Sequence, residues 1–172
     1  LISGLGIITT VYAIAQKLID SRLIQNTIPF LVVPVLLSFS FTFLTPDLIM
    51  VFLLLLYLHS LLDPKYKSST KSAIICGLLG GLAYLSKSYA LIFFVGHFSI
   101  INGLYYLNNS DQTVKKKIIS NYACGILALF VVAGPWIATI SCKYDKLMFT
   151  SASKFNYALM APNFTGRHQL NL

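Results

Sequence analysis

The sequence predicts an all-α fold, a polytopic integral membrane bundle of about six hydrophobic helices, several of them short. Hydrophobic residues make up 56% of the 172 positions, and charged residues make up only 10%, well below the roughly 25% of soluble domains. The mean hydropathy is +0.75. The apolar residues also gather in six runs separated by polar gaps. We therefore expect lipid to be the solvent of this chain.

The six apolar runs cover residues 1–16, 28–44, 47–62, 73–86, 88–107 and 118–140. A helix needs about 20 apolar residues to cross a bilayer, within a usable range of about 17–25. Only the last two runs qualify on their own. The shorter middle runs are expected to tilt, to thin the bilayer locally or to lie against neighbouring helices.

The 13 basic residues outnumber the five acids and give a formal charge of +8. In a soluble protein this excess would suggest nucleic acid, but here the charge lies in the gaps, and we expect no nucleic-acid partner. Eight basic residues fall in three gaps, at 17–27, 63–72 and 108–117. The short turns at 45–46 and 86–88 contain only Lys87. The positive-inside rule makes the three gaps cytoplasmic and the two turns outward-facing.

Residues 1–140 are expected to form part of a transmembrane bundle, and residues 141–172 the start of an extracytoplasmic loop or domain. The chain opens inside an apolar run, without an initiator Met or a basic n-region. It is therefore interpreted as a fragment of a longer membrane protein.

The run at 47–62 opens with Thr45-Pro46-Asp47, which places a carboxylate at the membrane interface. One interpretation is structural: Thr45 caps the helix, Pro46 takes its first position, and Asp47 complements the helix dipole. The other is functional, because an ionisable group at the mouth of a bundle usually faces a polar cavity or a partner. Lys87, on the other outward turn, is the expected opposite charge.

The run at 73–86 carries small residues at Gly77, Gly80, Gly81 and Ala83, which let helix backbones approach closely in lipid. It ends in Ser86-Lys87-Ser88, where two hydroxyls flank a cation. Such a group suits a phosphate at the interface. A lysine that merely extends toward the headgroups is the alternative.

Thr45-Pro46-Asp47, the basic turn that follows, and GLLGGLAYLSKSYALIFF at 77–94 together resemble the membrane glycosyltransferases of the GT-C fold. The nearest branch contains protein O-mannosyltransferases and lipid A aminoarabinose transferases, including bacterial enzymes that use polyprenyl-phosphate sugars. The resemblance covers roughly residues 25–162. It implies an enzyme of the bacterial inner membrane, with membrane lipid, a polyprenyl-phosphate sugar donor and an acceptor lipid, glycan or protein as partners.

The resemblance implies inverting transfer of the sugar to an acceptor hydroxyl at the extracytoplasmic face. Asp47 matches the second acidic position of the family, and Ser86-Lys87 matches its hydroxyl–lysine turn. Asp47 would line the sugar or acceptor cavity, and Lys87 would help to hold the polar site or the carrier phosphate. The main catalytic base is expected upstream of Leu1, so this fragment alone is expected to be inactive. Ser88 and Tyr89 stand where many relatives have Gly.

The tail also contains a stretch that resembles bacterial members of the family, in which Asn156 would bind sugar hydroxyls and Tyr157 would lie beneath the sugar ring. An interfacial aromatic belt explains Tyr157 equally well.

The remaining polar and reactive residues are given structural interpretations. His97 is expected to be a buried, hydrogen-bonded histidine rather than a metal ligand. Cys76 and Cys124 are expected to act as small buried hydrophobes, and Cys142 has no partner for a disulfide or metal site. No ligands for a divalent metal can be identified, so the cofactor is left open. Pro135 is expected to kink or end the last run.

Two other classes of function compete with the transferase. A transporter or flippase for lipid-linked material would use similar short, Gly-broken helices, although the polar groups here gather at one face rather than near the midplane. A non-catalytic subunit of a membrane assembly is the third interpretation.

Overall fold

The computed structural model of the chain describes residues 2–42 and 46–150, without the side chains of residues 40–42. This part contains no strand and six α-helices: α1 (Ile2–Leu18), α2 (Arg22–Thr42), α3 (Asp47–Leu61), α4 (Thr70–Ser86), α5 (Ala90–Leu107) and α6 (Gln112–Lys143). The predicted all-α bundle is confirmed. The chain divides into two compact units, Leu1–Ala133 and Gly134–Leu172.

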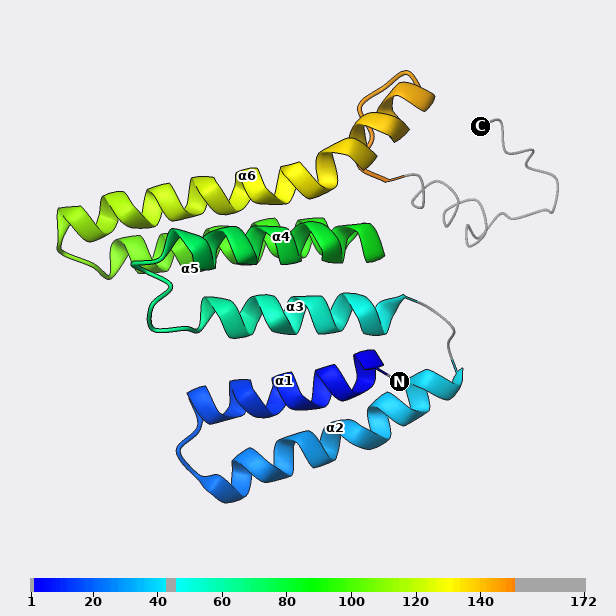
Figure 1. Cartoon of the computed structure of the whole chain (residues 1–172), viewed down its shortest axis with the longest axis vertical. Coiled ribbons are helices and arrows are strands. Elements are labelled where there is room, and N and C mark those ends of the chain that lie inside the picture. The colour runs from blue at the N-terminus through cyan, green and yellow to red at the C-terminus, as the bar shows by residue number, and fades with distance from the viewer. Residues whose placement is uncertain (1, 43–45, 151–172) are drawn as a thin grey trace, which may run out of the picture. The chain divides into compact units, whose positions relative to one another are not determined.

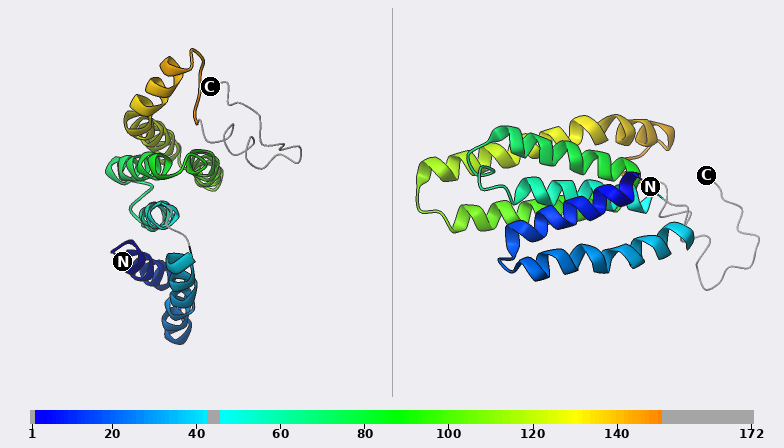
Figure 2. Two further views of the ribbon diagram at one scale, coloured as in Figure 1. Left: turned by 90° about the vertical axis from the view of Figure 1, so that its right-hand side faces the viewer. Right: turned by 60° about the horizontal axis from the view of Figure 1, so that its bottom comes forward.

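Within the first unit the helices alternate in direction, so that the loops α1–α2, α3–α4 and α5–α6 share one end (Figures 1 and 2). This end, called the basic end below, carries eight cationic residues: Lys17, Arg22, Lys65, Lys67, Lys71, Lys115, Lys116 and Lys117. The start of α3 and the turn between α4 and α5 lie at the opposite end, called the Asp47 end. The three basic gaps of the sequence thus lie at one end of the first unit, and the two turns that were expected to face outward lie at the other.

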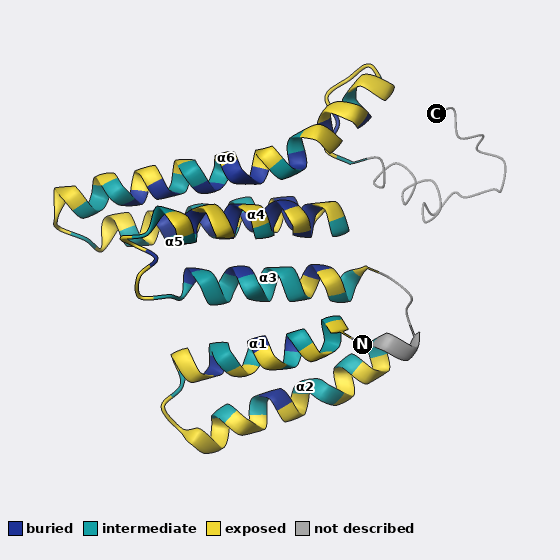
Figure 3. Ribbon diagram, viewed as in Figure 1, coloured by how far each residue is buried: buried dark blue, intermediate teal, exposed yellow. Residues whose placement is uncertain are grey.

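Within the described residues, three helices are long and apolar enough to cross a membrane: α2, α5 and α6. The sequence predicted only the last two. The difference arises because α2 begins at Arg22, and the polar residues before the apolar run at 28–44 continue the helix. Most of α2 is exposed (Figure 3), including Phe30 and Leu31, as expected of a surface that faces lipid.

The glycines of α4 bring this helix close to two neighbours. A Cβ atom on Gly80 would lie 2.5 Å from the ring of Phe94 in α5, and one on Gly81 would lie 2.7 Å from Cβ of Val132 in α6. A Cβ atom on Gly77 would overlap the backbone of Gly125. The predicted role of these small residues in helix packing is therefore confirmed.

The loop between α3 and α4 is fastened inside the first unit by Tyr66, which is only 1% exposed. Its hydroxyl donates to Oδ1 of Asn102 at 2.9 Å, and its carbonyl accepts from Nδ2 of Asn121 at 3.0 Å. The loop at the basic end is thus tied to both α5 and α6 through buried hydrogen bonds, which stabilise the ends of the helices that it joins.

In the second unit α6 continues through Pro135 to Lys143, so the helix does not end at the proline. After the helix, the Met148 amide donates to Oγ of Ser141 at 3.0 Å. The predicted division of the chain at residue 140 falls inside α6 and stays a prediction.

Candidate functional site

Asp47 is the first residue of α3 at the Asp47 end. Pro46 occupies the N-cap position with φ −71° and ψ 8°, and its carbonyl accepts from the Met50 amide at 3.1 Å. The proline therefore lies one position earlier than predicted, because α3 begins directly after it. The predicted cap, Thr45, lies outside the described residues. Asp47 itself stands in the first turn, where the helix dipole favours a carboxylate.

Lys87 ends α4 in an extended conformation, with φ −151° and ψ 127°. Its amide donates to the Ala83 carbonyl at 2.9 Å, and its own carbonyl accepts from the Ala90 amide at 3.0 Å. The lysine is thus held between the last turn of α4 and the first residue of α5. It sits at the negative end of the α4 dipole, which favours a cation.

These two residues form an ion pair, with 2.7 Å between Nζ of Lys87 and Oδ1 of Asp47. The side chains are 33% and 16% exposed, respectively. The expected approach of the two charges is confirmed. A partly exposed pair contributes only about 0–1 kcal/mol to stability, so this pair adds little to the stability of the bundle.

Tyr89 joins the pair as a third member. Its hydroxyl donates to the same oxygen, Oδ1 of Asp47, at 3.1 Å, and Nζ of Lys87 lies 5.8 Å from the centre of its ring. Burial raises the pKa of the Tyr89 hydroxyl, and the hydrogen bond and charge of Asp47 raise it further against the opposing effect of Lys87. The phenol therefore remains a proton donor at neutral pH.

A small apolar cluster is formed by residues close in the sequence to the three polar residues. Met50 of α3, Ala83 of α4 and Ala90 of α5 are buried together, with Leu53 and Leu54 packed against them. Ala83 and Ala90 have no exposed surface. Because alanine allows close approach, the ends of three helices converge at this point. The site therefore rests on a packed base that fixes its geometry.

The model of the dolichyl-phosphate-mannose-protein mannosyltransferase family matches residues 1–137, which include the whole site. The chain belongs to this family. No curated protein and no solved structure matches it. Membership of this mannosyltransferase family, together with the long apolar helices, makes the chain an integral membrane protein of a glycosyltransferase family. Such a family implies a lipid-linked sugar donor and an acceptor.

Of the other residues that the resemblance singled out in this member of the mannosyltransferase family, the structure describes one. Ser86 lies beside Lys87, but its hydroxyl donates to the Leu82 carbonyl at 3.1 Å, so only its acceptor lone pairs can serve a ligand. Asn156 and Tyr157 lie outside the described residues. The substrate-binding roles of all these residues stay predictions.

His97 has the expected hydrogen-bond partner, but its side chain is half-buried rather than buried, and the burial expected of the two cysteines in the apolar runs is found for one of them. Nδ1 of His97 lies 2.6 Å from the hydroxyl of Tyr57, and no group of three His, Cys, Asp or Glu side chains forms a metal site among the described residues. Cys76 is buried and Cys142 exposed, whereas Cys124 is only half-buried. All three thiols are free.

Sequence reasoning missed Tyr89. A tyrosine at the start of an apolar run is normally attributed to the interfacial aromatic belt, and its bond to Asp47 depends on the packing of α3 beside the α4–α5 turn. The available signal was local: Ser88 and Tyr89 replace the Gly expected after the lysine. The departure from the family pattern directly after Lys87 was therefore the sequence feature that could have indicated Tyr89.

Proposed function

We propose that this protein transfers a sugar from a polyprenyl-phosphate carrier to an acceptor hydroxyl, with inversion, at the Asp47 end of the bundle. The observation that carries the proposal is the ion pair of Lys87 with Asp47, at 2.7 Å, within a chain that belongs to the mannosyltransferase family. In this reaction the acceptor oxygen attacks the anomeric carbon, and the bond between that carbon and the carrier phosphate breaks. The phosphate leaves with the electron pair, and a carboxylate base takes the proton of the acceptor hydroxyl.

Lys87 is proposed to stabilise the departing phosphate. An ammonium group has three N–H donors, so a lysine paired with Asp47 can also donate to phosphate oxygens. Charge that develops on a leaving group in a water-poor site is stabilised most by a cation that is already in position. The turn that fixes the Lys87 backbone, through its bonds to Ala83 and Ala90, provides this preorganisation.

Asp47 is proposed to line the sugar or acceptor cavity and to orient Lys87. Tyr89 would steady the carboxylate, because its hydroxyl and the Lys87 ammonium contact the same oxygen. Ser86, Asn156 and Tyr157 remain proposed ligands of the donor, through the carrier phosphate or the sugar hydroxyls. The resemblance of the chain to bacterial enzymes supports a location in the bacterial inner membrane.

The test is a transfer assay on the full-length protein that measures donor binding separately from turnover. Asp47→Asn is expected to lower turnover on the order of 10²-fold while donor binding persists. Lys87→Ala is expected to weaken donor binding as well. Asp63→Asn and Lys71→Ala are matched controls, because they remove the same charges at the basic end. Wild-type turnover and binding in both site variants would refute the proposal.

The face of the membrane is tested by labelling. The positive-inside rule supports a cytoplasmic basic end and an extracytoplasmic Asp47 end. In a variant without Cys76, Cys124 and Cys142, a cysteine introduced by Ser88→Cys should react with an impermeant maleimide in intact cells. One introduced by Ser68→Cys should react only after the membrane is opened. The reverse pattern would place the proposed reaction on the wrong face.

A further inference from the structure

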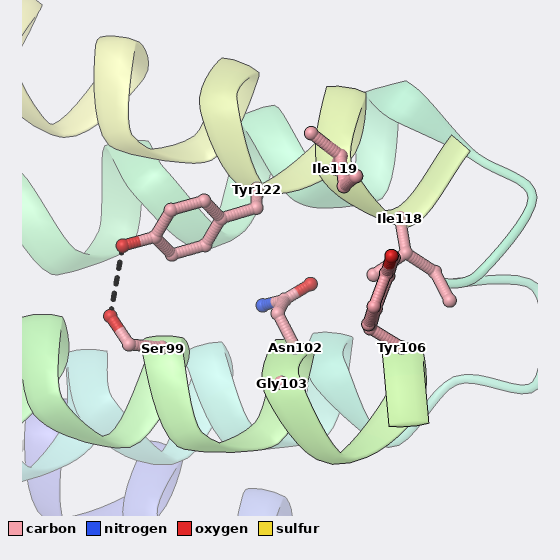
Figure 4. A pocket seen from close by; sticks show the side chains of 7 residues that line it. All are labelled: Ser99, Asn102, Gly103, Tyr106, Ile118, Ile119 and Tyr122. Carbon is pink, nitrogen blue, oxygen red and sulfur yellow. Dashed lines mark hydrogen bonds between the residues drawn. The ribbon is translucent and has the colours of Figure 1, made fainter. Parts of the chain in front are cut away.

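A groove lies between α5 and α6 near the basic end, away from the Asp47 end (Figure 4). Its volume is about 400 Å³, and it is lined by Ser99, Asn102, Gly103, Tyr106, Ile118, Ile119 and Tyr122. On each helix the lining residues recur at the three- and four-residue spacing that places side chains on one face. The groove therefore follows the two helices lengthwise.

The hydroxyls of Ser99 and Tyr122 lie 2.9 Å apart and bridge the two helices at one end of the groove, as Figure 4 shows. The other end, called the open end below, lies nearer the loop that joins α5 and α6. Toward the loop, Tyr106 is 38% and Ile119 55% exposed. A Cβ atom on Gly103 would have no other atom within 4 Å. The middle of the groove is thus open space with mainly apolar walls, as an acyl chain requires.

Positive charge stands at the open end. Lys115 precedes Ile118 and Ile119 by one helical turn and continues their face of α6, and its Nζ lies 5.0 Å from the ring centre of Tyr106. Lys116 beside it is exposed. The next residue, Lys117, is already bonded to the hydroxyl of Thr70 at 2.7 Å. Lys115 therefore lies against a lining residue of the groove, and Lys116 adds a second, exposed ammonium group at the next position of α6.

The neighbouring acid, Asp111, offsets only part of the charge of Lys115 and Lys116, because one carboxylate stands near two ammonium groups. Asp111 accepts from the amide and the hydroxyl of Thr113, at 2.8 and 2.7 Å, and these bonds lower its pKa. The Asp111 carboxylate thus stabilises the first turn of α6 through these two hydrogen bonds. Cations near the start of a helix are disfavoured by the helix dipole, so an external anion beside Lys115 and Lys116 would be stabilised by both lysines.

We propose that this groove binds one anionic phospholipid, with an acyl chain between α5 and α6 and its phosphate at Lys115 and Lys116. Basic pockets between transmembrane helices on the cytoplasmic side suit anionic headgroups, and each nearby lysine strengthens the attraction. The inference requires the basic end to face the cytoplasmic leaflet. It does not depend on the proposed transfer reaction.

The test is native mass spectrometry of the full-length protein from nanodiscs that contain equal amounts of phosphatidylglycerol and phosphatidylcholine. The wild type should retain one phosphatidylglycerol with at least about tenfold preference, and Lys115→Gln with Lys116→Gln should reduce that preference about tenfold or more. Lys65→Gln with Lys71→Gln removes the same charge at the same end and should leave it unchanged. Soluble glycerol phosphate should not displace the lipid.

A second pair of variants tests the groove itself. Gly103→Leu places an apolar side chain in the groove, where a Cβ atom meets open space, and should lower retention of both lipids about tenfold. Gly96→Leu is the matched control, because it lies on the same helix, is equally unobstructed and is not part of the lining. Equal retention of the two lipids by the wild type, equal retention by the two glycine variants, or displacement by glycerol phosphate would overturn the proposal. So would a cross-linked transmembrane helix in the groove.

Discussion

Lys87 and Asp47 form an ion pair across the ends of two antiparallel helices, with 2.7 Å between Nζ and Oδ1. Each charge also lies at the end of its own helix where the dipole favours it, Asp47 at the start of α3 and Lys87 at the end of α4. The arrangement therefore places a cation and a carboxylate side by side without strain. Tyr89 completes it through the same carboxylate oxygen.

The titration of Tyr89 should report on both charged neighbours. Asp47→Asn removes causes that raise the pKa of Tyr89, so that pKa should fall; Lys87→Ala removes the cause that lowers it, so that pKa should rise. The measurement is the tyrosinate absorbance, taken as the difference between each protein and its Tyr89→Phe counterpart. Equal pKa values in all three backgrounds would show that the contacts of Tyr89 do not persist.

The same shift implies a pH dependence of stability. Because the folded-state pKa of Tyr89 is raised above the ordinary tyrosine value of about 10, folding favours the neutral phenol. Its contribution is fully present below pH 10 and is lost as the pH rises through the folded-state pKa. The difference in unfolding free energy between wild type and Tyr89→Phe should therefore be constant below pH 10 and should shrink above it.

Gly77→Ala should destabilise the bundle, because the new methyl group would overlap the backbone of Gly125. Overpacking of this kind costs about 1–3 kcal/mol. The control is Gly96→Ala, where the methyl group meets open space and alanine is the better helix former by about 1 kcal/mol. Thermal unfolding in detergent measures both variants. Equal melting temperatures would contradict the close packing of α4 against α6.

Tyr66→Phe should destabilise the protein by about 1–3 kcal/mol, because Oδ1 of the buried Asn102 loses its donor. Asn102→Leu should then cost less in the Tyr66→Phe background than in the wild type, by the coupling energy of the pair. Tyr12→Phe, on the exposed side of α1, is the control. Strictly additive losses in chemical denaturation would show that the two side chains act independently.

The helix count and the segregation of charge were predictable, because apolar runs and basic gaps are local properties of the sequence. The positions of the helix ends were harder to predict. α2 and α6 begin before their apolar runs, at Arg22 and Gln112, since polar residues near the interface continue a helix without a hydrophobic signal. The length of α2 was underestimated for this reason.

The placement of Asp47 and Lys87 at the same end of the bundle was predictable from topology, because an even number of membrane crossings returns the chain to the same face, but their 2.7 Å contact was not. The bonds of Tyr66 with Asn102 and of Tyr89 with Asp47 were not. They depend on how each helix is rotated about its axis, and the apolar residues that cover most faces of α3 and α5 leave that rotation unmarked in the sequence.

The most direct test of the proposed site is a double-mutant cycle on sugar transfer by the full-length protein, with Asp47→Asn, Lys87→Ala and the double variant. If the two residues act as one unit, each single variant loses turnover on the order of 10²-fold, and the double variant loses no more than the worse single one. Losses that multiply, or wild-type turnover in either single variant, would contradict the account.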